Sequence, residues 1–435
     1  MNKKIVHFIG IGGIGVSALA GWFKAYGWEV SGSDIETTGH SPSLLPKDAR
    51  LVIYSNAISP DNPELKKAKK LGIKTFSYPE ALGELTKAHR TIAVAGSHGK
   101  STTTALLSLI LIKAGFDPTV IIGTKLREFG DSNFKYGKSN YLVIEADEWK
   151  GAFWHYSPTF AVITNIDKEH LDFYKNFNNV KKSFLKFIGN IHSSGVLVVN
   201  KDDKPLYALR GSIKKIAKKN KFKVLWYGKN QKTVPKIKKV LQLPGAHNLS
   251  NAVAAYTLAK KLGIKEKLIL SAIKKYKGAW RRMEYRGRFE ILDSRFKIPV
   301  FDDYAHHPTE IKATLAAFCE KFPSQKIICI FQPHQADRLK RLFKEFQTAF
   351  NDANSLILLP IYKVTGRDKT DKRFTSKILA SKIPGAIYLE NPKNLPKVLK
   401  GIFLKAKSSK LKAIIVMMGA GNIVKYTNLL LRFRT

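Results

Sequence analysis

The sequence predicts an α/β protein of about three domains. Its 435 residues are about three times the usual length of one domain. Short apolar runs of strand length alternate with helix-like segments, and glycine-rich turns follow two of these runs, at residues 10–15 and 96–99. The apolar fraction of 44% and the charged fraction of 25% are average for globular proteins, which excludes a disordered or low-complexity chain.

The first region, residues 1–89, begins as a Rossmann-like domain does. A strand at 5–9, a helix at 14–25 and a strand at 29–32 are expected, followed by a strand at 51–54 and a helix near 64–70. The turn after the first strand fits G-x-G-x-x-G, a pattern in which the backbone approaches a diphosphate at a helix N-terminus. The candidate binding residues are Gly12, Gly13, Ile14, Gly15 and, 19 residues later, Asp34.

The central region, residues 90–283, begins with a second strand and glycine turn. An apolar strand at 91–95 leads through a loop into a helix expected at 103–114. The loop supplies glycines that free backbone N–H groups, a lysine for the β/γ-phosphates and a hydroxyl for Mg²⁺, although its first glycine is three rather than five residues before the second. We therefore expect an ATP-type nucleotide and Mg²⁺ at Gly96, Ser97, His98, Gly99, Lys100, Ser101 and Thr102.

Polar side chains follow two further strands of this region. The strand at 141–144 is followed by Glu145-Ala146-Asp147-Glu148, and the strand at 160–164 by Asn165 and then His170. A carboxylate at the carboxyl end of a strand beside a phosphate loop is in the place of a Mg²⁺ ligand. Glu145 and His170 are thus candidate metal ligands, and the alternative is solvated loop acids with a surface histidine.

Two asparagines begin a helix near residue 246. Asn248 and Asn251 are three residues apart, so both amides lie on one side of the first turn. An amide can pair with the donor and acceptor edges of adenine, whereas the structural alternative is that Asn248 only caps the helix.

The third region, residues 284–435, returns to a Rossmann-like alternation. Strands are expected at 300–301, 326–331, 355–359 and 414–418. Two polar clusters follow strand ends, Asp302-Asp303-Tyr304-Ala305-His306-His307-Pro308 and Gln332-Pro333-His334.

The charge of the chain is strongly basic. With 75 basic and 33 acidic residues the net charge is +42, which accelerates the binding of anionic partners. No RNA-binding motif or zinc spacing accompanies it, so no nucleic-acid partner is expected. Two cysteines fit a reducing cytoplasm, and no apolar run reaches the ~18 residues of a membrane span. Glycines interrupt the apolar stretch 5–23, which favours strand, turn and helix over a signal peptide.

Taken in order, the motifs resemble the peptidoglycan-building Mur ligases. The resemblance covers nearly the whole chain: GIGGIG and SGSD, GSHGKSTTT, EADE, TNIDKEHLD, GAHNLSNA, WRRMEYRG, DDYAHHPTE and FQPH. It implies a UDP-sugar-binding domain, a central ATPase domain and a C-terminal domain that brings the amino acid and closes over the site. The chain departs from the family at Gln335, where an arginine is usual, and Arg338 is the nearest replacement.

The resemblance also implies roles for matching residues. Lys100, Arg282 and His306 would be catalytic, and Ser101, Glu145 and His170 would hold Mg²⁺. Asn248 and Asn251 would contact adenine, and Arg282 and Asp303 would reach the nucleotide. The substrates would be bound by the glycine turn with Asp34, and by His98, Asn165, Tyr304, His306, His334 and Arg338.

The activity implied is an ATP-dependent joining of L-alanine to the carboxylate of UDP-N-acetylmuramate through an acyl phosphate. A monomer or dimer with small-molecule substrates and no membrane partner is expected. Three alternatives stay open: a ligase that adds a tripeptide to the same sugar, an NAD-dependent dehydrogenase using the first glycine turn, and a nucleic-acid-binding P-loop protein.

Overall fold

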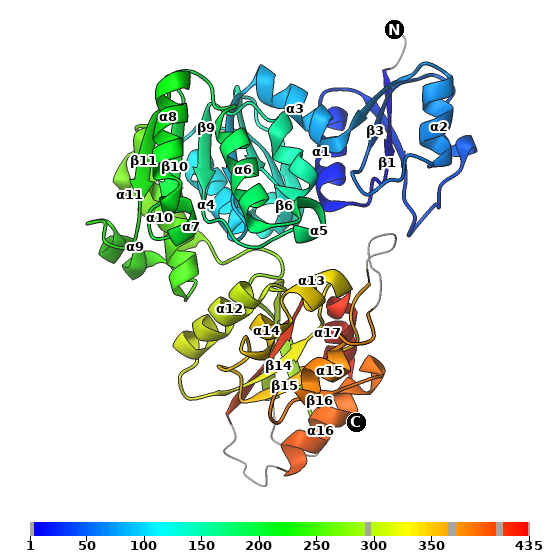
Figure 1. Cartoon of the computed structure of the whole chain (residues 1–435), viewed down its shortest axis with the longest axis vertical. Helices are drawn as coiled ribbons and strands as arrows, with labels where there is room; N and C mark the ends of the chain where they lie inside the picture. The colour runs from blue at the N-terminus through cyan, green and yellow to red at the C-terminus, as the bar shows by residue number, and fades with distance from the viewer. Residues whose placement is uncertain (1–3, 292–296, 364–370, 406–411, 434–435) are drawn as a thin grey trace. The chain divides into compact units, whose positions relative to one another are not determined.

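The computed structural model describes residues 4–291, 297–363, 371–405 and 412–433. Three β-sheets with surrounding helices are present in these ranges (Figure 1), which confirms the predicted α/β class. The chain forms two compact units: Met1–Gln242 with Asn248–Ala279, and Leu243–His247 with Trp280–Thr435. The first unit holds two of the sheets and the second unit holds the third.

The first sheet contains four parallel strands in the order β2-β1-β3-β4. The apolar N-terminal stretch forms one of the two inner strands and the first helix, and the predicted succession of strand, turn and helix is confirmed. The elements are β1 (Ile5–Ile9), α1 (Ile14–Ala25), β2 (Glu29–Ser33), η1 (Pro42–Leu44), β3 (Ala49–Tyr54), α2 (Pro63–Lys70), β4 (Lys74–Ser77) and α3 (Tyr78–Ala88).

The second sheet has seven strands in the order β11-β10-β9-β5-β8-β6-β7, and only β7 is antiparallel to its neighbour. Its strands are β5 (Arg90–Ala95), β6 (Thr119–Leu126), β7 (Ser132–Lys135), β8 (Tyr141–Glu145), β9 (Phe160–Ile163), β10 (Val196–Asn200) and β11 (Lys223–Tyr227). Its helices are α4 (Lys100–Lys113), η2 (Arg127–Phe129), η3 (Trp149–His155), α5 (Leu171–Tyr174), α6 (Phe177–Ile188), α7 (Lys204–Ala208), α8 (Arg210–Asn220), α9 (Val234–Val240), α10 (Ala246–Lys261) and α11 (Glu266–Lys275).

The order of this sheet positions the candidate site. Strand β5 is central and lies between β8 and β9, all three parallel. Carboxyl ends of parallel strands meet at one edge of a sheet, so the loop after β5, the acids after β8 and the polar segment after β9 converge. Nearly all residues of the three strands are buried, as expected for strands covered on both faces.

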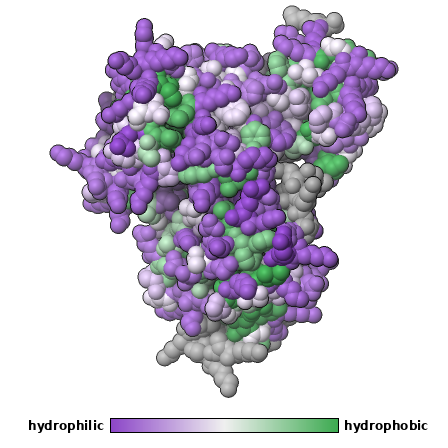
Figure 2. Space-filling model, viewed as in Figure 1, coloured by the Kyte–Doolittle hydropathy of each residue, from purple (hydrophilic) through white to green (hydrophobic). Residues whose placement is uncertain are grey.

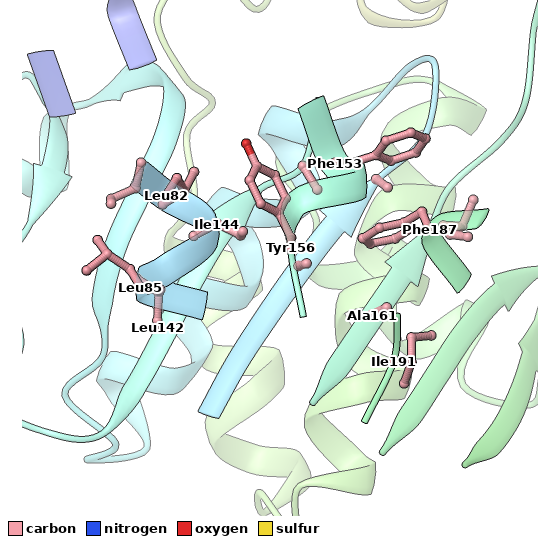
Figure 3. Packing of buried hydrophobic residues seen from close by; sticks show 14 of the residues in the cluster. Leu82, Leu85, Leu142, Ile144, Phe153, Tyr156, Ala161, Phe187 and Ile191 are labelled. Atoms are coloured by element: carbon pink, nitrogen blue, oxygen red, sulfur yellow. The ribbon is translucent and has the colours of Figure 1, made fainter. Parts of the chain in front are cut away.

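One apolar core continues through both sheets of the first unit. Figure 3 shows Leu82 and Leu85 of α3 beside Leu142 and Ile144 of β8. Helix α1 also packs on β6 and β7, where a Cβ added to Gly21 would lie 2.9 Å from the Phe134 ring. The glycine turn and the phosphate loop are thus carried by one packed body.

The third sheet has six strands in the order β12-β13-β17-β14-β15-β16, with β12 antiparallel and the others parallel. Its elements are β12 (Glu284–Glu290), β13 (Lys297–Asp303), α12 (Pro308–Lys321), β14 (Lys326–Phe331), α13 (Ala336–Arg341), α14 (Phe343–Gln347), β15 (Ser355–Leu358), α15 (Ser376–Ser381), β16 (Ile387–Tyr388), η4 (Pro392–Asn394), α16 (Leu395–Lys405), β17 (Ala413–Met418) and α17 (Ile423–Arg432).

Helix α4 begins earlier than the sequence predicts. It begins at Lys100 rather than residue 103, because Gly99 has a φ of 82° and ends the loop in a single residue. Lys100 and Ser101 therefore belong to the first helical turn, where backbone N–H groups point out of the helix end.

The surface is dominated by hydrophilic residues on the face drawn in Figure 2. Residues 204–265 alone contain 16 Lys or Arg and no Asp or Glu. Within the described ranges no helix combines the length and apolarity required to cross a bilayer.

We predict that Phe153→Ala lowers the free energy of unfolding by about 3–5 kcal/mol, because truncating a buried ring leaves a cavity. Phe153 is 0% exposed and stacks on Phe187 at 4.9 Å between ring centroids (Figure 3). Urea denaturation of both proteins measures the change. Leu71→Ala, at a side chain 55% exposed, is the control and should stay within about 0.5 kcal/mol of the parent. A loss below about 1 kcal/mol in Phe153→Ala would contradict the prediction.

Candidate active site

The phosphate loop after β5 is shaped by two glycines. Gly96 and Gly99 have φ values of 134° and 82°, in the region that L side chains rarely adopt. A Cβ at Gly96 would collide with the Thr164 hydroxyl, and one at Gly99 would collide with the side chain of Asn251. The loop therefore lies directly against α10 and the end of β9, with no room for a larger residue.

Asn165 holds the loop in place. Its Oδ1 accepts a hydrogen bond from His98 N at 2.8 Å, and its Nδ2 donates to His98 O at 2.9 Å. Thr164 Oγ1 donates to the same carbonyl at 2.6 Å, and His98 Nε2 is 2.9 Å from Asp167 Oδ2. Asn165, a predicted sugar-binding residue, is thus committed to the loop backbone by both ends of its amide.

Lys100 lies at the centre of the site. Its Nζ donates to Gly96 O and to Glu148 Oε2, each at 2.7 Å, and is 3.8 Å from Asp147 Oδ1. Burial by itself would lower the pKa of Lys100, but the charges of Glu148, Asp147 and Glu145 outweigh burial and raise it. The lysine is therefore a fixed positive charge at the loop.

Glu145 is held at the end of β8 by the loop and by β6. Its Oε1 accepts from Ser101 Oγ at 3.1 Å and its Oε2 from Gly123 N at 3.0 Å. Burial raises the pKa of this carboxyl despite the charge of Lys100. The structure thus brings together the hydroxyl and the carboxylate that the sequence predicts as metal ligands.

A second acidic group lies beside them. Ligand atoms of Asp147, Glu148 and His170 all lie within 4.8 Å of one another, and His170 Nε2 is 3.9 Å from Glu148 Oε1. Within the described part of the chain that Glu148 oxygen is buried without a hydrogen bond. Burial raises the pKa of Glu148, and the charge of Lys100 opposes this shift. The oxygens of two neighbouring carboxylates, Asp147 and Glu148, are of the kind that Mg²⁺ prefers as ligands.

The asparagine pair lies close to the loop. Helix α10 begins at Ala246, so Asn248 is inside the first turn and the alternative that it caps the helix is wrong. Both amides are buried, and Asn251 is the side chain that Gly99 contacts.

The glycine turn of the first sheet is closed by Asp34. Its Oδ2 accepts from Gly12 N at 2.9 Å, and a Cβ on Gly12 would lie 2.8 Å from that oxygen. Ile14, the first residue of α1, is 38% exposed at the turn. Gly15 faces the ring of Tyr78, whose Oη would lie 2.9 Å from an added Cβ.

A buried acid beneath this turn was not predicted. Glu64 is 0% exposed; its Oε2 is 2.7 Å from His7 Nε2, and its Oε1 is 3.0 Å from His40 Nδ1. Ser33 Oγ, at the end of β2, donates to Glu64 Oε1 at 2.9 Å. These contacts join residues up to 57 positions apart, which no local pattern reveals.

In the second unit Asp303 shapes the backbone at the end of β13. Its carboxylate accepts from Met283 N and Ala305 N, each at 2.8 Å, and from Thr314 Oγ1 at 3.3 Å. Burial raises its pKa. Asp303, predicted to reach the nucleotide, thereby holds the segment that carries Arg282.

The remaining predicted residues of this unit gather around Glu310, which was not predicted. Glu310 Oε1 is 3.8 Å from Arg282 Nη1, and its Oε2 is 3.2 Å from His306 Nδ1. The Arg282 guanidinium lies 5.2 Å from the Tyr304 ring centroid. Glu310 lies in the first turn of α12. Acidic residues favour helix N-termini, so the sequence carries a local signal for its position.

His334 and Arg338 complete the cluster. The rings of His306 and His334 are 5.9 Å apart, and His334 stacks on Tyr362 at 5.5 Å. Arg338, in α13, donates from Nη1 to His334 O, which lies before the helix, at 3.1 Å. Gln335 has a φ of 70°, and its backbone N–H donates to Tyr362 O at 3.1 Å. Its backbone therefore stabilises the turn before α13.

Family models match three successive parts of the chain. They are the catalytic domain of the Mur ligase family at residues 5–90, the Mur ligase middle domain at 94–259, and the Mur ligase glutamate ligase domain at 287–421.

Relatives cover nearly the whole chain. The UDP-N-acetylmuramate–L-alanine ligase of Aquifex aeolicus is 36% identical, over 97% of this chain and 96% of the relative. The ligase of the same name from Caldicellulosiruptor bescii is 38% identical over 99% of each. The solved MurC ligase of Thermotoga maritima has 25% identity and a TM-score of 0.76 over 98% of each chain. A murein peptide ligase from Psychrobacter arcticus, at 22% identity and a TM-score of 0.69 over 99% of each chain, shares the fold.

We predict that His7→Gln reduces the loss of stability that occurs as the pH falls below about 6.5. Burial lowers the pKa of His7 below 6.5, although Glu64 opposes the shift. A lowered folded pKa contributes stability above the unfolded pKa that is lost as the pH falls, at no more than about 1.4 kcal/mol per pH unit. Denaturation at several pH values measures the slope. Exposed His192→Gln should leave it unchanged, and an unchanged slope in His7→Gln would contradict the prediction.

Proposed function

This chain belongs to the Mur ligase family, and from that premise we propose that it is an ATP-dependent ligase of peptidoglycan synthesis that joins L-alanine to the carboxylate of UDP-N-acetylmuramate. The observation that carries the proposal is Lys100, held between the phosphate loop and Glu148 beside Glu145 and His170. Relatives named for this activity cover nearly the whole chain, whereas the murein peptide ligase likeness supports the fold alone. L-Alanine is therefore preferred over a tripeptide.

The chemistry explains why the site is built from charges rather than nucleophiles. A carboxylate resists attack by an amine because oxide is a prohibitive leaving group. Transfer of the γ-phosphate converts it into an acyl phosphate, the alanine amine attacks, and inorganic phosphate leaves. Catalysis then consists of bringing anionic groups together and neutralising them.

In the first unit Lys100 and the N–H groups of the loop, residues 96–102, would hold the phosphates. Ser101, Glu145 and His170 would bind Mg²⁺, with Asp147 and Glu148 next to them. Bound Mg²⁺ supplies positive charge to the phosphate oxygens. Asn248 and Asn251 would contact adenine, and the glycine turn with Asp34 would hold the UDP-sugar.

In the second unit Arg282 would neutralise phosphate charge, and Tyr304, His334 and Arg338 would bind phosphates and amino acid. Glu310 would orient Arg282 and His306. When His306 Nδ1 donates to Tyr304 O, 3.0 Å away, Nε2 is the nitrogen that can accept a proton from the alanine ammonium.

The domain boundaries are part of the proposal: residues 1–89 for the UDP-sugar, 90–283 for ATP and 284–435 for the amino acid. So are a cytoplasmic location, a monomer or dimer, and the absence of a nucleic-acid partner. The dehydrogenase alternative is less well supported, because it leaves the Lys100 site unexplained.

We predict that Lys100→Ala lowers phosphate release at least ~100-fold, since a fixed charge at the transferred phosphate is lost. Binding of UDP-N-acetylmuramate, measured by calorimetry, should change less than about threefold. The control Lys113→Ala removes an exposed lysine at the other end of α4 and should be fully active. Normal turnover by folded Lys100→Ala would refute the assignment of the loop.

We predict that Arg282→Met lowers kcat about 100-fold in the same coupled assay with ATP, Mg²⁺, the UDP-sugar and L-alanine. The methionine keeps the length of the stem and removes the charge. Arg288→Met, at an exposed position on β12, tests whether loss of any arginine in this region suffices. Equal activity of the two variants would remove Arg282 from the proposed machinery.

A further inference from the structure

A lysine outside the predicted set reaches from the acidic cluster to the first sheet. Lys150 follows Glu148 by two residues and has a φ of 51°, with Gly151 next at 71°. This left-handed pair interrupts η3, and Lys150 Nζ donates to Asn56 O, in the loop after β3 of the first sheet, at 3.2 Å. The side chain is exposed and also lies over the Trp149 ring, 4.8 Å from its centroid.

The loop that contains Asn56 packs against the glycine turn. It follows β3, and an added Cβ at Gly10 would lie 3.1 Å from Ser55 Cβ and 3.6 Å from Ile58 Cδ1. The Lys150 ammonium therefore lies at the carboxyl edge of the first sheet, beside the turn where a diphosphate binds in this kind of fold.

Tyr78 shows that the turn and the acidic cluster are neighbours. Its ring contacts Gly15 at the N-terminus of α1. Burial, followed by the nearby charges of Glu145 and Asp147, raises the pKa of the same phenol. A UDP-sugar bound at the turn with its carboxylate near Lys100 would pass this point.

Lys150 has the capacity for a further anionic partner. An ammonium has three N–H donors, and the described part of the chain uses one of them on Asn56 O. Lys150 forms no ion pair within the described residues, whereas Lys100 contacts Asp147 and Glu148.

We propose that Lys150 is a substrate-binding cation that contacts the diphosphate of the UDP-sugar and positions it between the glycine turn and the phosphate loop. The inference rests on the proposed function for the identity of the substrate, but the diphosphate contact is testable by itself.

Binding of uridine, UDP and UDP-N-acetylmuramate is measured by calorimetry for the parent, Lys150→Met and Lys150→Arg. Lys150→Met keeps the apolar stem but removes the charge. It should therefore weaken the binding of UDP and of the UDP-sugar about tenfold and leave the binding of uridine unchanged. Lys150→Arg should stay within about threefold of the parent. Lys182→Met, at an exposed position of α6, is the matched control and should bind all three as the parent does.

Three results would overturn the proposal. Equal UDP affinity of Lys150→Met and parent would remove the diphosphate contact. Weakening of the UDP-sugar alone would assign Lys150 to the sugar carboxylate. A uridine affinity lowered as much as that of UDP would mean that the variant disturbs the Asn56 loop, which also counts against the proposal.

Kinetics separate this inference from the proposed function. In the parent, turnover of the UDP-sugar with L-alanine tests the function itself. In Lys150→Met the KM for the UDP-sugar should rise about tenfold, with kcat and the KM for ATP within about twofold. The KM of the parent should rise with salt, and that of the variant should rise less, because a screened charge has been removed. If the parent shows no turnover but Lys150→Met binds UDP more weakly than the parent, the proposed function is refuted and the diphosphate contact is supported.

Discussion

The contact between Lys100 and Glu148 is the interaction on which the first unit's site depends. A buried ammonium is stable only if its charge is compensated and its donors are used, and here a loop carbonyl and a carboxylate do both. Glu145 is the last residue of β8, and Glu148, three residues later, contacts Lys100 at the start of α4.

The acidic residues of this basic chain are concentrated in the segment that carries the candidate site. In a protein of net charge +42, residues 145–172 contain six Asp or Glu, whereas residues 204–265 contain none. Carboxylates at the strand ends create local negative charge within a basic chain. The net positive charge favours the approach of anionic substrates such as nucleotides, and the acids keep the buried lysine charged.

Sequence patterns predict the parts of the site that depend on local geometry. Strand β1, helix α1 and strand β14 have the expected bounds, and the loop, Ser101 and Glu145 come together because they follow adjacent parallel strands. The pairing of Glu148 with Lys100 and the contacts of Glu64 with His7 and His40 join segments that are distant in the sequence, so no local pattern predicts them. The sequence pattern predicts the start of α4 three residues too late for another reason: the left-handed Gly99 ends the loop, and the helix begins at Lys100.

In each sheet a carboxylate at or just after the end of one strand holds the neighbouring backbone. Asp34 accepts Gly12 N, Glu145 accepts Gly123 N, and Asp303 accepts Met283 N and Ala305 N. Backbone donors lower the cost of burying each charge, so the turns are preorganised before any ligand arrives. Asp303 is the extreme case: it is 3% exposed and has three donors, so its effect on a ligand acts through the segment it holds. Glu145 keeps its contact with Ser101 at the loop and can act on a ligand directly.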